Sequence, residues 1–383
     1  MNKTFASTVR AFIDTLRLLN LKKQNRQIAF YSEGKNYWPH LAPLLESVLS
    51  KTNSTVSYIS SALDDPGLRL SHQRYSAFYI GEGYLRNHVF LNFDFNSVVM
   101  TMPDLNRYQV KRSRHDVHYI YVPHSLVSLH MCYKNQAFQY YDTICCAGPH
   151  HVREIEAMSA RLRWSSKNII ELGFPRLDSL IKNKQRKVSI GGGRTKIVLI
   201  APSWGPNGMI ESRLCLSLIA DLIQLNYSVI LRPHPQTIKF NPIQVREIIK
   251  AFETSAQFKF EESVDGEQSL HNSNLMISDW SGAAIEYALA LNKPVIFCNT
   301  PKKINNPNYA DIEIEPVEVF IRDQIGLIWD GVVPIKPVIE KIEEFSTKNS
   351  KSLRAKFVFN QPNRVEDFVN FLNHINSEKS KLM

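Results

Sequence analysis

The amino-acid sequence predicts an α/β protein with two doubly wound domains, and three observations predict this class. Short runs of β-branched and aromatic residues alternate with helical stretches along most of the chain. The 383 residues exceed the roughly 100 to 200 residues of one domain. A basic segment at residues 181–196, which contains three consecutive glycines and no acid, interrupts the alternation. Two parallel sheets joined by a linker follow from these features.

The strands of both sheets are expected at the apolar runs. In the first half these are residues 28–31, 56–60, 77–80, 98–102, 118–122 and 143–146, with a helix at 41–49. In the second half they are residues 197–201, 228–231, 258–260, 275–278 and 295–298, with helices between them. Such sheets bind ligands at the carboxyl ends of their strands, so the residues after each strand are the candidates for chemistry.

The domain bounds follow from the linker. We expect an N-terminal Rossmann-like domain at residues 1–180, a linker at 181–196, a C-terminal Rossmann-like domain at 197–335 and a helical tail at 336–383. The two domains are expected to face each other across a cleft. The glycine triplet at 191–193 is not a phosphate-binding loop, because no Gly-Lys-Ser/Thr follows it.

Composition bounds the class of protein. A 44% hydrophobic content supports a sizeable core, and 46 Lys and Arg against 36 Asp and Glu give a net charge of +10. The five cysteines have no Cys-x-x-Cys spacing, which argues against a disulfide framework or a zinc ribbon. No apolar run reaches the roughly 18 residues of a membrane span. A cytoplasmic protein in a reducing compartment is expected.

Residues 1–26 form a predicted basic, amphipathic helix. Six basic residues accompany a single acid, and apolar residues recur at helical spacing: Phe5, Val9, Phe12, Ile13, Leu16 and Leu19. The helix either packs on its own domain or rests on an anionic membrane surface, and both interpretations stay open.

Polar loops follow three strands of the second half. Ser203 follows the first of them, and Asp279, Ser281 and Gly282 precede a strong helix former. Free N–H groups at that helix start would bind an anion such as a diphosphate, and Ser281 could cap the helix or contact a phosphate oxygen. An ordinary helix cap is the alternative. Glu286 lies further along the helix. Its carboxylate either accepts hydrogen bonds from ribose hydroxyls or is an ordinary solvated charge on the helix surface.

Histidines supply the candidate catalytic groups. Arg232 and His234 alternate across a strand end between fixed prolines, so that two cations could meet a diphosphate that gains charge during transfer. His124 follows a strand of the first half and is the candidate base that takes the proton of an acceptor hydroxyl. His130, His150 and His151 are alternative candidates for the base, but they are less well placed in the sequence for this role than His124 is. No dinucleotide fingerprint and no metal-ligand spacing is found, so neither cofactor nor metal is expected.

With these residues in view, the chain resembles the CDP-glycerol glycerophosphotransferase family, the teichoic acid primases and polymerases of GT-B fold. The matching segments, between about Ile120 and Pro301, are Gly173–Asp178, Ala201–Trp204, Arg232–Pro235, Asp279–Gly282 with Glu286, and Lys293–Ile296. The resemblance implies an acceptor-side first domain, a nucleotide-donor-binding second domain, and transfer of glycerol phosphate from CDP-glycerol to a hydroxyl of a lipid-linked glycan.

The resemblance also implies residue roles. His124 resembles the family's base, His234 with Arg232 its diphosphate-contacting pair, Ser281 its phosphate-binding hydroxyl and Glu286 its ribose contact. Three positions depart from the family pattern. Ser125 stands where the family has Gly, Trp280 replaces Tyr, and Gly282 replaces a second Ser.

The predicted function is therefore a transferase that moves glycerol phosphate, or a related polyol phosphate, from a CDP-activated donor to a cell-surface glycan or lipid-linked acceptor. Teichoic-acid-like, capsule or lipopolysaccharide synthesis would need it at the inner face of a bacterial plasma membrane. A glycosyltransferase using an ordinary nucleotide sugar and a nucleotide-sugar 2-epimerase are alternatives. A basic module that binds nucleic acid or lipid is a third, but no nucleic-acid motif is apparent and we expect no nucleic-acid partner.

Overall fold

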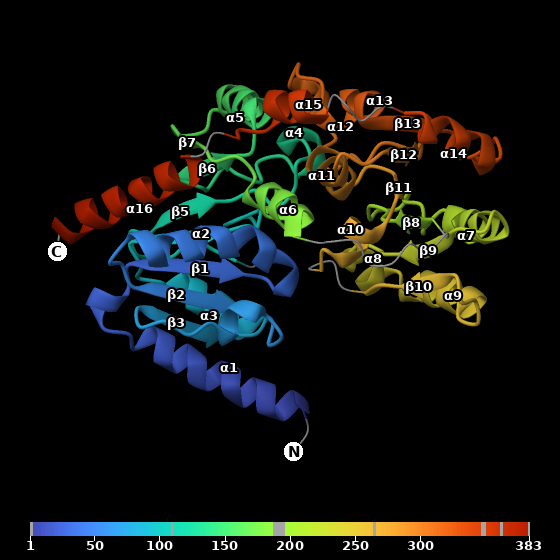
Figure 1. The fold of residues 1–383 in the computed structure, drawn as a ribbon. Helices are drawn as coiled ribbons and strands as arrows, with labels where there is room; N and C mark the ends of the chain where they lie inside the picture. The colour runs from blue at the N-terminus through green and yellow to red at the C-terminus, as the bar shows by residue number, and fades with distance from the viewer. Residues whose placement is uncertain are drawn as a thin grey trace. The chain divides into compact units, whose positions relative to one another are not determined.

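The computed structural model describes residues 3–108, 110–186, 196–262, 266–345, 350–360 and 363–381. Contacts between residues divide the chain into two compact units. The first unit is Met1–His124, Tyr133–Arg176 and Phe357–Met383, and the second is Ser125–Cys132 and Leu177–Lys356. Each unit is built on one parallel sheet, which confirms the predicted α/β class with two doubly wound domains (Figure 1).

The first unit holds a seven-stranded sheet in the order β3-β2-β1-β4-β5-β6-β7. Its strands are β1 (Ile28–Ser32), β2 (Val56–Ser60), β3 (Tyr75–Tyr79), β4 (Ser97–Met100), β5 (His118–Tyr121), β6 (Thr143–Cys146) and β7 (Asn168–Glu171). β1, β2 and β4 to β6 are nearly continuous buried runs, as sheets covered on both faces require. The predicted strands agree within two residues, whereas β7 was not predicted.

Helices cover both faces of this sheet. They are α1 (Lys3–Leu19), α2 (Trp38–Lys51), α3 (Tyr84–Asn92), α5 (Pro149–Leu162) and α16 (Arg364–Lys381). The C-terminal helix α16 returns to lie beside α2 (Figure 1), where Phe368, Val369 and Leu372 join the core with residues of β1 and β2.

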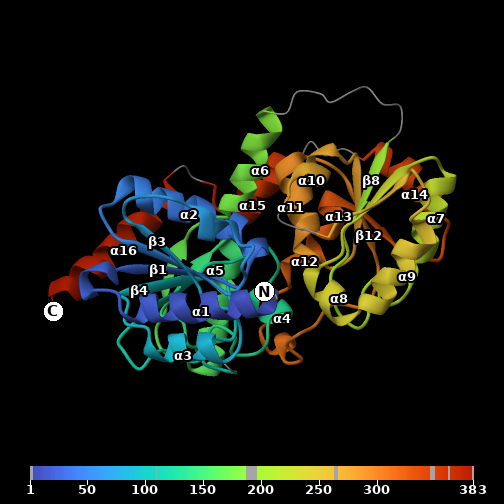
Figure 2. The same cartoon turned by 90° about the horizontal axis from the view of Figure 1, so that it is seen from below.

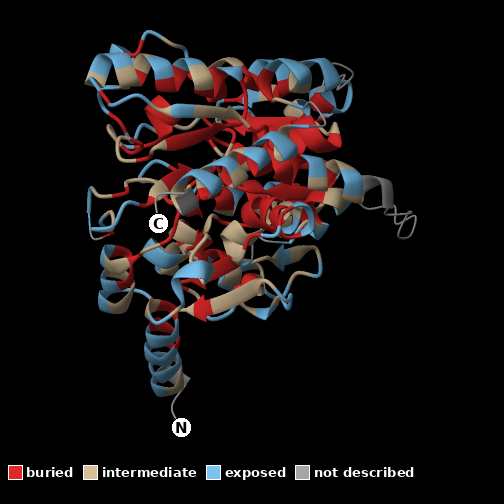
Figure 3. Cartoon of the chain, turned by 90° about the vertical axis from the view of Figure 1, so that its left-hand side faces the viewer, coloured by how far each residue is buried: buried red, intermediate tan, exposed pale blue. Residues whose placement is uncertain are grey.

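Helix α1 packs on the edge of the first unit through one face only. Ala11, Thr15 and Leu18 are buried, and α1 contacts β3 and α3. Buried Asp14 accepts the backbone N–H of Tyr79 at 3.1 Å, which fastens the helix to the end of the edge strand. The interpretation that the helix packs on its own domain thus holds for this face, while Figure 3 shows exposed residues over much of the rest.

The second unit holds a six-stranded sheet in the order β10-β9-β8-β11-β12-β13. Its strands are β8 (Ile197–Ile200), β9 (Ser228–Leu231), β10 (Phe258–Phe260), β11 (Leu275–Ser278), β12 (Val295–Cys298) and β13 (Gly326–Trp329). Taken along the chain this is order 3-2-1-4-5-6, that of a dinucleotide-binding Rossmann sheet. The strand bounds match the predicted ones within one residue, and β13 was not predicted.

Helices lie on both faces of the second sheet (Figure 2). They include α7 (Leu214–Gln224), α9 (Pro242–Phe252) and α14 (Ile335–Glu343), which bury Leu218, Val245 and Ile339 in one core. The others are α4 (Leu129–Cys132), α6 (Pro175–Arg186), α8 (Pro235–Phe240), α10 (Gln268–Asn272), α11 (Gly282–Leu291), α12 (Val317–Phe320), α13 (Arg322–Ile325) and α15 (Ser350–Phe357).

The segment expected to be a linker begins as helix, because α6 continues through Arg186. Residues 187–195, with the glycine triplet, lie outside the described residues. Among the helices in the described ranges, none combines the length and the apolar composition needed to cross a bilayer.

Candidate functional site

The second unit gathers predicted site residues at its switch point, where strand order reverses between β8 and β11. Ser203 follows β8, and Asp279 follows β11. The backbone N–H of Ser203 donates to Asp279 Oδ1 at 2.7 Å, and Ser278 Oγ donates to the carbonyl of Ala201 at 2.7 Å. Both loops are therefore fastened to each other at the edge where doubly wound sheets bind ligands. Asp279 is buried, and it positions Ser203.

Helix α11 starts at this edge. Ser281 is its N-cap, and its Oγ accepts the N–H of Ala283 at 3.3 Å. A Cβ atom at Gly282 would overlap Ser125 Oγ and lie 3.4 Å from Val127 Cγ1, so the segment after β5 packs directly on the helix start. Glu286 is only 6% exposed, which excludes the solvated-charge interpretation.

Arg232 and His234 both follow β9, but their described contacts go to different elements. The Arg232 guanidinium is buried and donates to Ser269 Oγ at 3.2 Å and to the carbonyl of Gly266 at 2.9 Å. His234 caps α8, because its Nδ1 accepts the N–H of Gln236 at 3.1 Å. An accepting Nδ1 leaves the proton of the neutral ring on Nε2, so His234 Nε2 is a hydrogen-bond donor.

Trp204, the last residue of one matching segment, lies beside His234, and Lys303, which was not selected from the sequence, lies over the Trp204 ring. The indole of Trp204 has its centroid 6.0 Å from that of the His234 ring. Lys303 Nζ lies 4.6 Å from the Trp204 centroid on the loop that follows β12. The strand-end criterion could have found Lys303, since Lys302 and Lys303 come shortly after the predicted strand at 295–298.

His124 lies at the corresponding edge of the first unit, after β5. Its Nδ1 donates to the carbonyl of Thr101 at 3.1 Å, because a carbonyl oxygen can only accept. The rings of Tyr37, His40 and Tyr133 surround it at centroid distances of 5.4, 6.3 and 6.0 Å. With Nδ1 as the donor, Nε2 of the neutral ring is unprotonated and can accept a proton.

The three competing histidines are buried: His150 packs against the ring of His151 at a centroid distance of 4.2 Å, and the other two are hydrogen-bonded to backbone. His130 Nε2 donates to the carbonyl of Ile314 at 3.0 Å, and His151 Nδ1 accepts the N–H of Ala147 at 3.2 Å. Burial holds the pKa of His40 well below its usual range, with Arg176 and His124 as further causes. His40 is therefore a neutral neighbour of His124.

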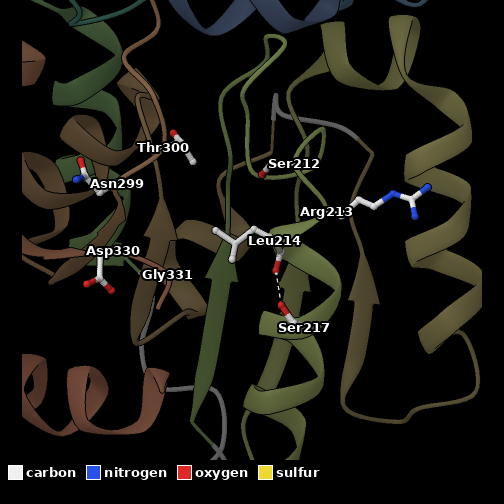
Figure 4. A pocket seen from close by; sticks show the side chains of 8 residues that line it. All are labelled: Ser212, Arg213, Leu214, Ser217, Asn299, Thr300, Asp330 and Gly331. Atoms are coloured by element: carbon white, nitrogen blue, oxygen red, sulfur yellow. Dashed lines mark hydrogen bonds between the residues drawn. The ribbon is translucent and has the colours of Figure 1, made fainter. Parts of the chain in front are cut away.

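A shallow pocket of about 420 Å³ lies elsewhere in the second unit (Figure 4). Its lining is Ser212, Arg213, Leu214, Ser217, Asn299, Thr300, Asp330 and Gly331, and includes none of the predicted site residues. The Arg213 guanidinium points away from it and pairs with Glu247 of α9 at 3.6 Å. We therefore do not assign the donor site to this pocket.

Solved structures share this fold. The wall teichoic acid polymerase TagF, in a crystal soaked with CDPG, aligns with a TM-score of 0.62 at 14% identity over 99% of both chains. A putative UDP-N-acetylglucosamine 2-epimerase from Listeria monocytogenes aligns with a TM-score of 0.54 at 11% identity over 90% of this chain and 95% of that one. The UDP-GlcNAc 2-epimerase of Methanocaldococcus jannaschii, in complex with UDP-GlcNAc and UDP, aligns with a TM-score of 0.52 at 13% identity over 91% and 99%.

These identities show the fold alone, a pair of Rossmann-like units, and no curated protein matches the sequence. A family model narrows the class. The model for CDP-glycerol:poly(glycerophosphate) glycerophosphotransferase matches residues 134–327, more than half of the chain. The chain therefore belongs to this family and is a CDP-glycerol glycerophosphotransferase-like enzyme. The resemblance drawn from the sequence motifs is confirmed.

Proposed function

We propose that this enzyme transfers glycerol phosphate from CDP-glycerol to a hydroxyl of a cell-surface glycan or lipid-linked acceptor, in the synthesis of a teichoic-acid-like, capsule or lipopolysaccharide polymer. The observation that most supports it is the opposite hydrogen bonding of two histidines. His124 has an accepting Nε2 and His234 a donating Nε2. A proton acceptor and an anion-binding donor are the two groups that phosphoryl transfer to a hydroxyl needs.

The proposed reaction balances as follows. The acceptor oxygen attacks the phosphorus that carries glycerol, and His124 Nε2 takes the hydroxyl proton. The bond from that phosphorus to the bridging oxygen breaks, and CMP leaves with the electron pair. His234 Nε2–H and the positive end of the α11 helix dipole stabilise the charge that develops on the phosphates. In this proposal the first unit serves the acceptor and the second binds the nucleotide.

The remaining predicted residues take supporting roles in this proposal. Ser281 presents the helix start to a phosphate, and Gly282 lets Ser125 Oγ lie over that start, where a Cβ atom would overlap it. Glu286 would accept ribose hydroxyls. Ser203, Asp279 and Arg232 have partners within the second unit that hold the strand-end loops in place, which supports a role in shaping the donor site.

The histidines provide the direct test. His124→Gln and His234→Gln should each lower the rate of CMP release from CDP-glycerol by about tenfold to a hundredfold or more, because each removes one proton-transfer or charge-stabilising group. His115→Gln, at an exposed histidine of the first unit, is the matched control. Folded His124 and His234 variants that transfer at the wild-type rate would refute the mechanism.

A thermal-shift panel tests the donor. A ligand that binds only the folded protein adds about 2.7 kcal/mol of stability at a hundred times its dissociation constant. We expect CDP-glycerol to give the largest shift among CDP-glycerol, CDP-ribitol, UDP-sugars and GDP-sugars. A larger shift with a nucleotide sugar would indicate a glycosyltransferase, and acceptor-free conversion of UDP-GlcNAc, followed by NMR, would indicate an epimerase.

We further propose that α1 docks on the anionic inner face of the plasma membrane. Phe5, Val9, Phe12, Ile13 and Leu16 form an apolar face on α1 and are 39% to 60% exposed. The neighbouring basic residues Arg10, Arg17, Lys22 and Lys23 give the same surface a positive charge, which anionic lipid headgroups complement.

Vesicle flotation tests the docking. The variant Phe5→Ser/Phe12→Ser should release the protein from vesicles with phosphatidylglycerol, whereas neutral phosphatidylcholine vesicles should bind neither form. Phe240→Ser/Ile243→Ser, at two equally exposed apolar residues of the second unit, is the control and should bind as the wild type does. Unchanged binding of the α1 variant would contradict the proposal.

A further inference from the structure

Lys303 lies on a loop that is held at both ends. Before it, the indole N–H of Trp280 donates to the carbonyl of Thr300 at 2.9 Å. After it, the backbone N–H groups of Asn305 and Asn306 both donate to the carbonyl of Met131, at 3.0 and 3.2 Å. All these residues belong to the second unit. The backbone that carries Lys303 is therefore fastened within the second unit.

The nearby carboxylates attract this ammonium, but none of them forms an ion pair with it within the part of the chain that the structure describes, although Asp279 Oδ2 and Glu211 Oε2 are buried without a hydrogen-bond partner there. Asp279 accepts from Ser203, and Glu211 Oε1 accepts from Thr237 Oγ1 and Asn241 Nδ2, both at 3.1 Å. Glu318 accepts from Ser128 and Cys132. Among the described residues, none forms a hydrogen bond or a close ion pair with Lys303 Nζ, whose recorded contact is the face of Trp204.

An ammonium in this environment lowers the stability of the folded protein. Burial lowers the pKa of Lys303, and nearby acidic groups, Asp279 and Glu211 among them, only offset this. A desolvated cation without a bonded counter-charge lowers stability unless a ligand supplies the anion. The position also suits a ligand, because the Trp204 ring contacts both Lys303 and His234, and His234 does not use its donor Nε2–H to cap α8.

We propose that Lys303 is a further donor-binding residue, whose ammonium pairs with the diphosphate of the nucleotide donor. This inference rests on the proposed function, since it takes the switch-point edge of the second unit as the donor site. A cation there offsets the charge on the phosphate that remains with cytidine as the transferred group departs. Trp204 would orient the ammonium through its ring face.

Calorimetric titration of CDP and cytidine into the full chain tests the inference. Lys303→Met should weaken CDP binding by about tenfold to a hundredfold, the value of a charge-assisted contact, and leave cytidine binding unchanged. Lys303→Arg should retain most of the CDP affinity. Lys302→Met removes the same charge from the exposed neighbouring position and should bind both ligands as the wild type does.

The outcomes separate this inference from the proposed function. A wild-type chain that binds neither CDP nor CDP-glycerol refutes the proposed function itself. A wild-type chain that binds CDP, together with a folded Lys303→Met variant of equal affinity, refutes only the role of Lys303. Lys303→Gln repeats the test with a polar side chain if the methionine variant does not fold. Equal weakening by Lys302→Met would assign the effect to net charge and overturn the inference.

Discussion

Gly282 and Ser125 fit each other as a pair. The family pattern has Ser at the first position and Gly at the second, and this chain has the reverse. Because a Cβ at Gly282 would overlap Ser125 Oγ, the hydroxyl of Ser125 occupies the space over the start of α11 that a serine at 282 would fill. We therefore propose that the two departures from the pattern implied by the family resemblance compensate each other.

A double-mutant cycle tests this pairing. Gly282→Ser alone should lower the free energy of unfolding by about 1–3 kcal/mol through overpacking. Adding Ser125→Gly should recover most of this loss, with a coupling energy of at least about 1 kcal/mol. The measurement is denaturant unfolding of the four proteins. Strictly additive effects would show that the two positions do not compensate.

Lys303 also carries a prediction about stability. Because its folded-state pKa is lowered, the unfolded chain binds more protons than the folded one between that lowered pKa and the usual value near 10.5. Stability contributed by this group therefore rises with pH through that window, and its cost is largest below the lowered pKa. Without ligand, Lys303→Met should raise Tm at about pH 7, and the gain should shrink at alkaline pH. A lower Tm at neutral pH would contradict the unpaired-ammonium interpretation.

At the scale of elements, α11 combines a structural cap with a candidate phosphate site. Ser281→Ala should lower the free energy of unfolding by about 0.5–2 kcal/mol, because the N–H of Ala283 loses its acceptor. Ser281→Asp should retain the cap, since aspartate is an equally good N-cap. Its carboxylate would repel the donor's phosphates, and we expect donor affinity to fall by at least about tenfold.

These two variants separate the interpretations of Ser281. Chemical unfolding and CDP titration on each provide the measurements, and Ser217→Ala, an exposed serine in α7, should change stability by less than about 0.5 kcal/mol. Donor affinity that survives in a stable Ser281→Asp variant would show that α11 is only capped there, as the sequence analysis left open.

Most of the strands that the sequence predicted well are central. β2, β6, β9, β11 and β12 have the predicted bounds, and so does the edge strand β10, because short β-branched or aromatic runs between turn residues mark a strand. The strands that were missed, β7 and β13, are edge strands. Asn-Ile-Ile-Glu has only two apolar residues, and Gly-Leu-Ile-Trp begins with a residue that is typical of turns.

The candidate site also has a part that the sequence predicted and a part that it did not. Strand-end motifs indicated Ser203, Asp279 and Ser281, because the position of a loop after a strand can be read from the sequence. The contacts that decide their roles join distant segments, such as Asp279 with Ser203 or Arg232 with Gly266. No local pattern encodes these pairs, so the packing of Ser125 on Gly282 and the contact of Lys303 with Trp204 became visible only in three dimensions, although the strand-end criterion could have selected Lys303 itself.

At the scale of the whole molecule, the chain path assigns a segment of the first half to the second unit. Ser125–Cys132 groups with residues 177–356, although both of its flanks belong to the first unit. Glu318, 2% exposed, is one anchor of this segment: it accepts the N–H of Ser128 at 2.8 Å, Ser128 Oγ at 2.6 Å and Cys132 Sγ at 2.8 Å. The contact spans 190 residues of sequence.

Removal of this anchor should therefore destabilise the second unit selectively. Glu318→Ala leaves the buried N–H and O–H of Ser128 without an acceptor, at about 1–3 kcal/mol each. Native-state hydrogen exchange should show faster exchange in β11 and β12, while β1 and β2 keep their protection. Glu315→Ala, at an exposed acid three residues away, is the control. Equal loss of protection in both sheets would mean that the two units unfold together, and unchanged protection would mean that the segment is held by other contacts.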